Sequence, residues 1–299
     1  MEEPLRTKVQ GSAPPLITAA IPVFNAGKYL RLAVLSIVKQ TFTDWELLII
    51  DDGSTDNALQ DISDIRDARI RIFRDGENRG LASRLNEAID LARGQYLTRM
   101  DQDDVSYPGR FERQAEALQN DPRIDLIAVR AITIDENDQA TGLFPYSLSH
   151  SAICARPWRG FYLPHPTWMG RIDWFRKHRY TVPGPYFCED QELLLRSYCE
   201  SRFGTIDEVL FGYRNRTNVN WRKLAKTRKI LFNIQWRHFI ASHKWPFALL
   251  SLLTFIGRNA GDHLNILLPM FYQPRPDRVS APVLLQWHKV LDRLADKPT

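Results

Sequence analysis

The stretch Gln95-Tyr96-Leu97-Thr98-Arg99-Met100-Asp101-Gln102-Asp103-Asp104 joins a short, largely apolar segment to three carboxylates within four residues. Carboxylates crowded this closely raise one another's pKa unless a cation offsets their charge. Hard divalent cations such as Mg²⁺ and Mn²⁺ prefer oxygen ligands of this kind. The pattern therefore indicates either a metal site at the end of a buried strand or a solvated acidic turn.

Two segments upstream also run from an apolar strand into a polar turn. Residues 16–25 predict a buried strand, and a helix follows with an apolar face formed by Leu30, Ala33, Val34, Ile37 and Val38. Residues 47–50 predict a second strand, which leads into Asp51-Asp52-Gly53-Ser54-Thr55-Asp56. Successive side chains of a strand alternate in direction, so only one of Asp51 and Asp52 can face a ligand. Gly53 permits a sharp turn after them.

Each of the next two segments has apolar residues at helical spacing, which predicts a helix. The motif Glu77-Asn78-Arg79-Gly80 precedes a predicted helix with an apolar stripe at Leu81, Leu85, Ala88, Ile89 and Ala92, and we expect Gly94 to end it. Pro108 is expected at the first position of another helix, whose apolar stripe is Phe111, Ala115 and Leu118. Residues 126–129 predict a further buried strand.

In this order the motifs resemble the inverting family 2 glycosyltransferases, which have the GT-A nucleotide-sugar-binding fold. The resemblance covers residues 15–214 and rests on Pro22 to Asn25, Asp51 to Asp56, Asn78 to Gly80 with Asn86, Asp101 to Asp104, and Glu189-Asp190. The run from Arg99 through Pro108, Arg110, Phe111 and Gln114 is similar to bacterial enzymes that decorate surface polysaccharides.

The resemblance implies an α/β catalytic domain over residues 15–214, with a mixed, mostly parallel sheet flanked by helices. Its site is expected at the carboxyl ends of the strands. Residues 1–14 are expected to form a flexible tail. Residues 215–299 are expected to form a basic, aromatic-rich helical region.

The resemblance also implies roles for the carboxylates. Asp103 is expected to bind the metal, Mn²⁺ or Mg²⁺, and Asp101 to contact the ribose or the metal's waters. Asp190 is expected to be the general base, with Glu189 as second choice. A structural reading of this pair stays open, because both precede a predicted helix whose dipole favours carboxylates at that end.

Nucleotide recognition is assigned in the same way. Asp52 is expected to accept a hydrogen bond from the base, against a wall formed by Pro22, Val23 and Phe24, and Arg84 is expected to approach the nucleotide. Asn25 has two readings, a nucleotide contact or a cap of the following helix. His165 lies in Leu163-Pro164-His165-Pro166-Thr167, where the family has a His-x-Thr strand; it binds diphosphate or acceptor, or is structural. No glycine-rich phosphate motif is present, which argues against dehydrogenases and kinases.

Composition is that of a folded enzyme, with 299 residues, 44% hydrophobic and 25% charged. The three cysteines, Cys154, Cys188 and Cys199, have neither metal-ligand spacing nor an even number. The N-terminal residues lack the apolar stretch of a signal peptide. We therefore expect a cytoplasmic protein.

The charge is unevenly distributed. Residues 1–208 carry 25 Lys+Arg and 31 Asp+Glu, a net charge of −6, whereas residues 209–261 carry ten basic residues and no acidic one. Aromatic residues alternate with these basic residues, and the apolar run at 245–256 is too short to span a bilayer. The segment is expected either to lie on an anionic membrane surface or to pack as a basic helix on the catalytic domain. No reading motif for nucleic acid accompanies the charge.

The sequence therefore predicts an enzyme that transfers a hexose-type sugar from a nucleoside diphosphate donor, with inversion, to a saccharide acceptor, expected to be lipid-linked. The resemblance implies a role in cell-surface polysaccharide synthesis, and we expect the enzyme to act at the cytosolic membrane face. One alternative is a nucleotidyltransferase of the same fold, although residues 21–27 are not a glycine- and arginine-rich triphosphate loop. Another is a non-catalytic docking or polysaccharide-binding protein that has kept the fold.

Overall fold

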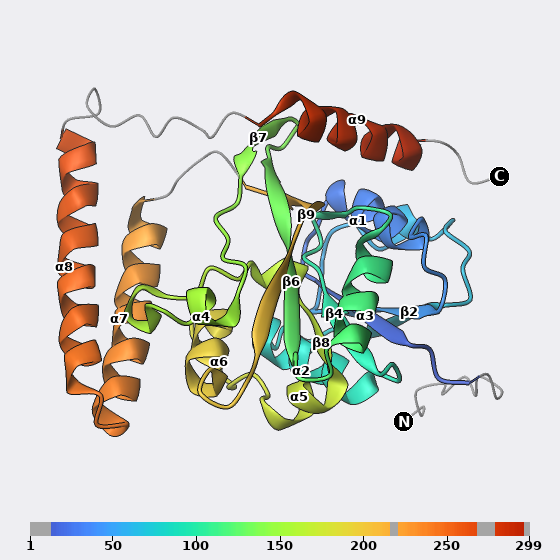
Figure 1. The fold of residues 1–299 in the computed structure, drawn as a ribbon. Helices are drawn as coiled ribbons and strands as arrows, with labels where there is room; N and C mark the ends of the chain where they lie inside the picture. Colours follow the sequence, from blue (N-terminus) through green and yellow to red (C-terminus); the bar gives the residue numbers. More distant parts are fainter. Residues whose placement is uncertain (1–12, 216–220, 268–278, 296–299) are drawn as a thin grey trace.

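A single mixed sheet organises the protein (Figure 1). The computed structural model describes residues 13–215, 221–267 and 279–295. Within these residues the sheet has nine strands, in the order β3-β2-β1-β4-β8-β6-β9-β5, and β7 pairs with β6. Most of the residues predicted as a flexible tail, 1–12, lie outside the described residues.

The N-terminal half of the sheet is parallel. It consists of β1 (Ile17–Val23), β2 (Trp45–Asp51), β3 (Ile70–Arg74) and β4 (Tyr96–Arg99), connected through helices α1 (Tyr29–Val38) and α2 (Leu81–Leu91) and the short 3₁₀ turn η1 (Gln60–Ile62). Parallel strands bring their carboxyl ends to one edge of the sheet. The polar turns after β1, β2 and β4 therefore meet there, as the sequence predicts.

The second half of the sheet mixes parallel and antiparallel pairs. Its strands are β5 (Val105–Ser106), β6 (Leu126–Ile134), β7 (Ala140–Leu143), β8 (Met169–Arg171) and β9 (Phe203–Arg214). Only β6 and β9 pair in parallel; β8 runs antiparallel to β4 and β6. The remaining elements of this half are α3 (Arg110–Asn120), α4 (His150–Ile153), η2 (Pro157–Arg159), η3 (His165–Thr167), α5 (Ile172–Lys177) and α6 (Glu189–Ser197).

Hydrophobic clusters cover both faces of the sheet. In β2, Leu47 and Ile49 belong to the cluster that also contains the buried residues of α1, whereas Leu48 and Ile50 join the cluster with α2 and α6. This division follows from the two-residue period of a strand. A strand buried on both faces reads as a continuous apolar run, which is why Leu47 to Ile50 show no polar alternation.

Three local predictions are wrong. Gly94 does not end α2; it lies against β1, where an added Cβ would stand 2.5 Å from the backbone nitrogen of Thr18. Pro108 precedes α3 without starting it, because the chain makes a turn before the first helical residue, Arg110. The His-x-Thr segment is the 3₁₀ turn η3 and not a strand, since prolines at 164 and 166 lack the N–H groups that a sheet requires.

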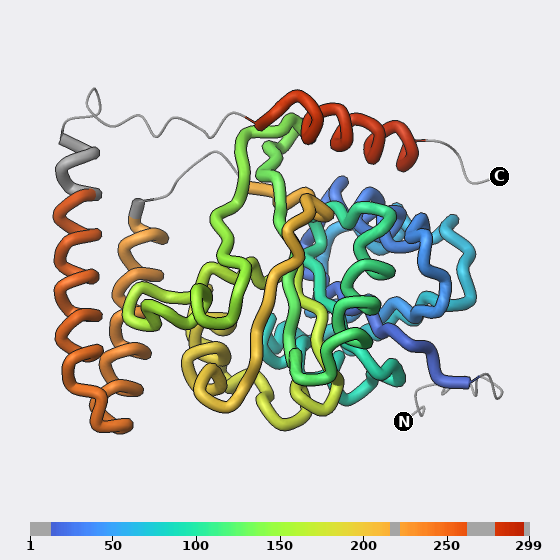
Figure 2. Tube along the Cα trace, viewed as in Figure 1, coloured from blue at the N-terminus to red at the C-terminus, as the bar shows by residue number. Residues whose placement is uncertain are grey.

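The C-terminal region contains three helices in its described part. Helices α7 (Trp221–Ala241) and α8 (Trp245–Leu267) lie side by side as an antiparallel pair (Figures 1 and 2). Helix α9 (Ala281–Ala295) lies apart from this pair, next to α1. Helix α7 contacts α6, and α8 contacts η2. Helix α9 packs on α1 and places Trp287 against Gly212 of β9. None of the helices in the described residues is both long and apolar enough to cross a membrane.

Candidate active site

One large cavity, of about 1020 Å³, opens at the carboxyl edge of the parallel strands. Ten of the predicted site residues line it: Pro22, Val23, Phe24, Asp52, Arg84, Asp101, Asp103, His165, Glu189 and Asp190. They come from turns and helix starts that are up to 168 positions apart in the chain (22 to 190). Tertiary structure thus gathers the separate motifs around a single pocket. Asn25 is outside this lining.

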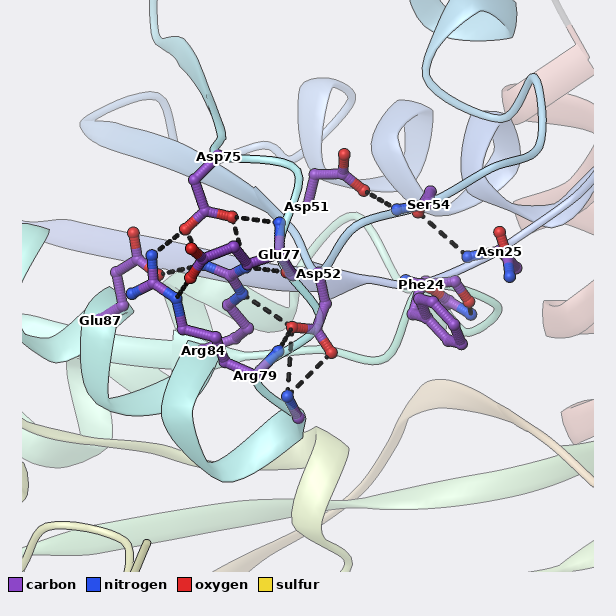
Figure 3. Close-up of polar contacts among 12 residues, drawn as sticks. Phe24, Asn25, Asp51, Asp52, Ser54, Asp75, Glu77, Arg79, Arg84 and Glu87 are labelled. Atoms are coloured by element: carbon purple, nitrogen blue, oxygen red, sulfur yellow. Dashed lines mark hydrogen bonds and ion pairs between the residues drawn. The ribbon is translucent and has the colours of Figure 1, made fainter. Parts of the chain in front are cut away.

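Asp52 lies at the end of β2 and is held by the start of α2 (Figure 3). The backbone N–H groups of Arg79 and Gly80 donate to its carboxylate at 2.7 and 3.1 Å, and Nε of Arg84 donates at 2.9 Å. Oδ1 accepts from Arg79, from Arg84 and, at 3.2 Å, from Gly80, whereas the one hydrogen bond to Oδ2 among the described residues is that from Gly80 at 3.1 Å. Oδ2 therefore retains acceptor capacity toward the pocket.

Arg84 is buried and uses all five of its N–H groups within the protein. They reach the carboxylates of Asp52, Asp75 and Glu87 and the carbonyl oxygen of Glu77 (Figure 3). A guanidinium has five donors, so none is left over for a phosphate in this arrangement. Arg84 reaches the pocket wall as predicted, but its contacts make it a support for Asp52 and for the turn that carries Asp75 and Glu77.

The turn after β1 is tied to the turn after β2. Asn25 has a positive φ of 49°, a conformation that asparagine tolerates better than most residues. Its side-chain oxygen accepts from the backbone of Thr55 at 2.8 Å, and its own N–H donates to Ser54 (Figure 3). The capping alternative for Asn25 is wrong, because α1 begins after Lys28, beyond its reach. Asn25 fixes the two loops to each other instead.

Phe24 forms an exposed wall of the pocket and is positioned by the acidic loop. Its backbone N–H donates to Oε1 of Gln102 at 2.7 Å, and its carbonyl accepts from Nε2 of the same side chain at 3.0 Å. The side chain of Gln102 thus makes the two backbone hydrogen bonds that a neighbouring strand would make to Phe24, just after β1. Gln102, the middle residue of Asp101-Gln102-Asp103, therefore positions Phe24 in the pocket wall.

The three carboxylates of the acidic loop have different surroundings. Asp103 and Asp101 line the pocket, and Asp101 forms an ion pair with the buried Arg99. Asp104 is buried, accepts the backbone N–H of Arg214 at 2.7 Å, and has its second oxygen unpartnered. Burial and the charges of Asp101 and Asp103 raise the pKa of Asp104 well above its usual range. Asp104 therefore anchors the loop from behind.

This donor set fits a hard divalent cation. The described residues contain no group of three or more His, Cys, Asp and Glu side chains arranged to hold a metal ion. Asp101 and Asp103 nevertheless present carboxylate oxygens to one pocket, and Mg²⁺ or Mn²⁺ commonly takes one or two carboxylates together with phosphate oxygens and water.

Glu189 and Asp190 begin α6 and line the same pocket. Burial, followed by the charge of Asp190, raises the pKa of Glu189 to about 7. Burial also raises the pKa of Asp190, although a hydrogen bond from Gln191 at 3.0 Å opposes the shift. A carboxylate with a raised pKa accepts a proton more readily at neutral pH, which suits a general base. The helix dipole also favours carboxylates in the first turn of α6, so the structural reading and the general-base reading both stay predictions.

His165 is nearly buried on the pocket wall. Its Nε2 and the hydroxyl of Tyr180 are hydrogen bonded at 2.8 Å, and its ring lies 4.5 Å from that of Trp168, centroid to centroid. Burial and the positive charge of Arg99 lower the pKa of His165 well below its usual range. The imidazole is therefore neutral, and its contacts are those of a packed structural residue at the edge of the site.

Sequence reasoning missed four residues that position this site. Arg99 forms an ion pair with Asp101, Gln102 accepts a hydrogen bond from Phe24, and Gln191 donates one to Asp190. Each of these three residues lies inside or next to a motif, so its position in the sequence could have indicated its role. Arg214 was different. It holds Asp104 through its backbone and the carbonyl of Asp103 through Nε at 2.7 Å, from 110 positions away, and nothing local in the sequence indicates that role.

A doubly wound α/β sheet with acidic turns around one pocket defines the GT-A class of nucleotide-sugar-binding domains. A sequence model of "Glycosyl transferase family 2" matches residues 18–179, more than half of the chain, and the protein belongs to this family. It is thus a glycosyltransferase.

Two relatives illustrate the range of similarity. An uncharacterized glycosyltransferase of Methanocaldococcus jannaschii is 27% identical over 222 residues, which cover 72% of this chain and 76% of the relative. The glucosyltransferase WfgD of Escherichia coli, named for the transfer of glucose from UDP-Glc to α-D-GlcNAc-diphosphoundecaprenol, is 31% identical over 103 residues. That match covers 34% of this chain and 41% of WfgD.

Solved structures agree in fold. S. aureus TarS in complex with UDP-GlcNAc has a TM-score of 0.62 at 16% identity, with 93% of this chain and 80% of that one covered. A mannosyltransferase of Pyrobaculum calidifontis in complex with GDP-Man and Mn²⁺ has a TM-score of 0.54, also at 16% identity, with 95% and 88% covered. Such low identity establishes the GT-A fold alone, as predicted from the sequence.

Proposed function

We propose that the protein transfers a hexose-type sugar from a nucleoside diphosphate-sugar to a lipid-linked saccharide, with inversion and with the help of a divalent metal. The observation that carries the proposal is the pocket itself: Asp101 and Asp103 face it from one side, and Glu189 and Asp190 from another. The first pair suits a metal-diphosphate and the second suits a hydroxyl that must lose its proton.

Donor recognition follows from the loops at the sheet edge. The free side of Oδ2 of Asp52 is available to a ring N–H of the base, with Phe24 and Pro22 beside it. Arg84 acts on the nucleotide indirectly, by holding Asp52. Two solved neighbours support this class of donor, since they bind UDP-GlcNAc and GDP-Man.

We assign Asp190 as the general base that accepts the proton of the acceptor hydroxyl. Gln191 donates to Oδ2 of Asp190 at 3.0 Å and holds the carboxylate at the wall of the pocket, where an acceptor hydroxyl would bind. Glu189 has a pKa of about 7, which also suits a base at neutral pH, and it stays the second candidate. Attack by the hydroxyl on the face opposite the leaving diphosphate inverts the anomeric carbon, and a single displacement needs no enzyme nucleophile.

Asp103, with Asp101 beside it, is assigned to hold Mn²⁺ or Mg²⁺. The ion supplies Lewis-acid stabilisation of the charge that develops on the leaving diphosphate. Arg99 orients Asp101 through their ion pair, and Arg214 fixes the loop from below. The complex of a neighbour with Mn²⁺ supports the use of a metal.

A lipid-linked acceptor and a cytosolic membrane location are supported by α8 and by the name of WfgD. Trp245, Leu249, Leu253 and Ile256 follow helical spacing and are each more than half exposed. The opposite face of α8 packs on the domain through Phe247 and Ala248. One face of α8 is thus packed on the domain, and we assign the exposed face to contact with a lipid surface.

Two alternatives lose support. Membership of the glycosyltransferase family disfavours a nucleotidyltransferase. A non-catalytic binding protein would need no base, yet Asp190 keeps a raised pKa inside the pocket. Hydrolysis of a sugar nucleotide that depends on added metal would separate an enzyme from a binding module.

The first test is a thermal-shift panel of UDP-, GDP- and dTDP-sugars, each with Mn²⁺, with Mg²⁺ and with EDTA. Binding to the native state raises the melting temperature by mass action. We expect one nucleotide class to give a shift that EDTA removes. If every sugar nucleotide leaves the melting temperature unchanged, and none is hydrolysed, the proposed activity is wrong.

A further inference from the structure

Helix α9 packs against the strands that follow the acidic loop. Trp287 of α9 is fully buried, and its ring stacks on that of Tyr107 with 5.9 Å between the centroids. A Cβ added to Gly212 would stand 2.9 Å from Cζ3 of the same indole. Tyr107 follows β5 directly, and Gly212 of β9 pairs with Val105, the residue after Asp104. Trp287 therefore fills the space next to the end of the acidic loop.

Trp287 also holds the turn between β6 and β7. Its Nε1–H donates to the carbonyl oxygen of Asp138 at 2.8 Å. Asp138 has a positive φ of 63°, which aspartate tolerates better than most residues. Its own backbone N–H donates to the carbonyl oxygen of Asp135 at 3.3 Å. The indole N–H therefore helps to keep Asp138 in this conformation.

The carboxylate of Asp138 pairs with Arg214. Nη2 of Arg214 donates to Oδ1 of Asp138 at 2.5 Å, and Nη1 donates to the carbonyl oxygen of Asp135. The arginine side chain is completely buried, and its guanidinium lies 4.4 Å from the ring centroid of Tyr29. A buried guanidinium cannot be hydrated and depends on such partners. The turn between β6 and β7 thus decides where Arg214 lies.

Arg214 continues this connection to the acidic loop. Its Nε donates to the carbonyl oxygen of Asp103, and its backbone N–H donates to Oδ1 of Asp104, both at 2.7 Å. Three hydrogen bonds therefore connect α9 to the backbone of the assigned metal ligand: from Trp287 to Asp138, from Arg214 to Asp138, and from Arg214 to Asp103.

Helix α9 is itself fixed to the catalytic domain near both of its ends. Nε2 of Gln286 donates to the carbonyl oxygen of Val209 at 3.3 Å, and Nζ of Lys39 donates to the carbonyl oxygen of Arg293 at 2.6 Å. Between these two contacts, Val290 is buried in the hydrophobic cluster that contains α1. The helix can therefore hold the turn between β6 and β7 in one place.

We propose that α9 sets the affinity of the acidic loop for its metal, with Trp287, Asp138 and Arg214 as positioning residues for Asp103. Residues that hold a metal ligand in place from behind matter for binding, and the loss of one typically weakens it about 10–100-fold. This inference rests on the proposed function, since it takes Asp103 as the metal ligand. It also places α9 with the catalytic domain, although the sequence predicts a separate region over residues 215–299.

The test titrates Mn²⁺ into the 299-residue chain with UDP, GDP or dTDP present. It records the Mn²⁺ concentration that gives half of the metal-dependent rise in melting temperature. Trp287→Phe removes the indole donor and keeps an aromatic ring in its place. Asp138→Asn removes the charge opposite Arg214 and keeps a residue that tolerates a positive φ. Val290→Ala is the matched control, because it loosens the packing of α9 and leaves the three hydrogen bonds in place.

We expect Asp138→Asn to need at least about tenfold more Mn²⁺ than the wild type. Trp287→Phe should need about two- to tenfold more, the effect of one lost hydrogen bond. Val290→Ala should lower the melting temperature and keep the wild-type Mn²⁺ requirement. Hydrogen exchange in residues 100–106, measured without ligand, should be faster in both test variants than in Val290→Ala. A role of α9 in stability alone would not separate the variants in this way.

An unchanged Mn²⁺ requirement in both test variants, or an equal increase in Val290→Ala, would overturn the inference and leave α9 as a stabilising element. Trp287→Phe decides the question by itself if Asp138→Asn folds poorly. The proposed function fails in a different way. If the wild type shows no metal-dependent shift with any of the three nucleotides, Asp103 is not a metal ligand and both proposals are wrong. A wild-type shift that both test variants retain rejects only the role of α9.

Discussion

Replacing Arg84 with methionine should strongly destabilise the protein, although no ligand contact is involved. The side chain is 1% exposed, and it holds three carboxylates and a backbone carbonyl. Asp75 and Glu87 are each 30% exposed in their side chains, so water can replace the arginine for them at little cost. Asp52 is 8% exposed and cannot be rehydrated in the same way.

The cost therefore comes mainly from Asp52. Removing one partner of a buried ion pair typically costs about 3–5 kcal/mol, since the remaining charge stays buried without compensation. A domain is commonly stable by about 5–15 kcal/mol, so this loss is a large share of the total. Two backbone N–H groups still bond to Asp52, which places the expected loss nearer about 3 kcal/mol than 5.

Urea unfolding at pH 7 measures the loss directly as a lower midpoint at constant slope. Arg79→Gln is the matched control, because Arg79 is 46% exposed and its pairs with Asp75 and Glu77 should contribute less than about 1 kcal/mol. A loss below about 1 kcal/mol for Arg84→Met, or equal losses for both variants, would refute the assignment of Arg84 as the support of Asp52.

The remaining predictions concern the chemistry and the surface. Asp103→Ala should abolish turnover and the metal-dependent thermal shift, whereas Asp190→Asn should abolish turnover and keep the shift; wild-type rates in either variant contradict its role. Glu189 has a pKa raised from 4.5 to about 7, so the folded state favours its protonated form and loses stability as the pH rises through that range. Glu189→Gln should therefore gain up to about 3 kcal/mol over the wild type at pH 8 and little at pH 4, by urea unfolding. Leu249→Glu with Leu253→Glu should release the protein from anionic liposomes at low salt without a change in melting temperature, since both side chains are 56% exposed; unchanged retention would leave only the packed role of α8.

The local motifs were predictable because short-range physics specifies them. A run of apolar residues followed by Asp51-Asp52-Gly53 identifies a buried strand and its turn. The alternation of side chains indicates that only one of the two aspartates faces the pocket, and in the structure that residue is Asp52. The same reasoning erred at Gly94. Its requirement for glycine comes from contact with Thr18, more than seventy residues away, and no local pattern carries that information.

The sequence by itself determined the family, the strand-turn motifs and ten of the residues that line the pocket, since the motifs are formed by neighbouring positions in the chain. Only the tertiary structure decided what each side chain does there. It shows that Arg84 is a buried support of Asp52 and that Arg214 holds Asp104 behind the acidic loop. Such roles depend on which distant atoms share a small volume, and chain position does not encode that directly.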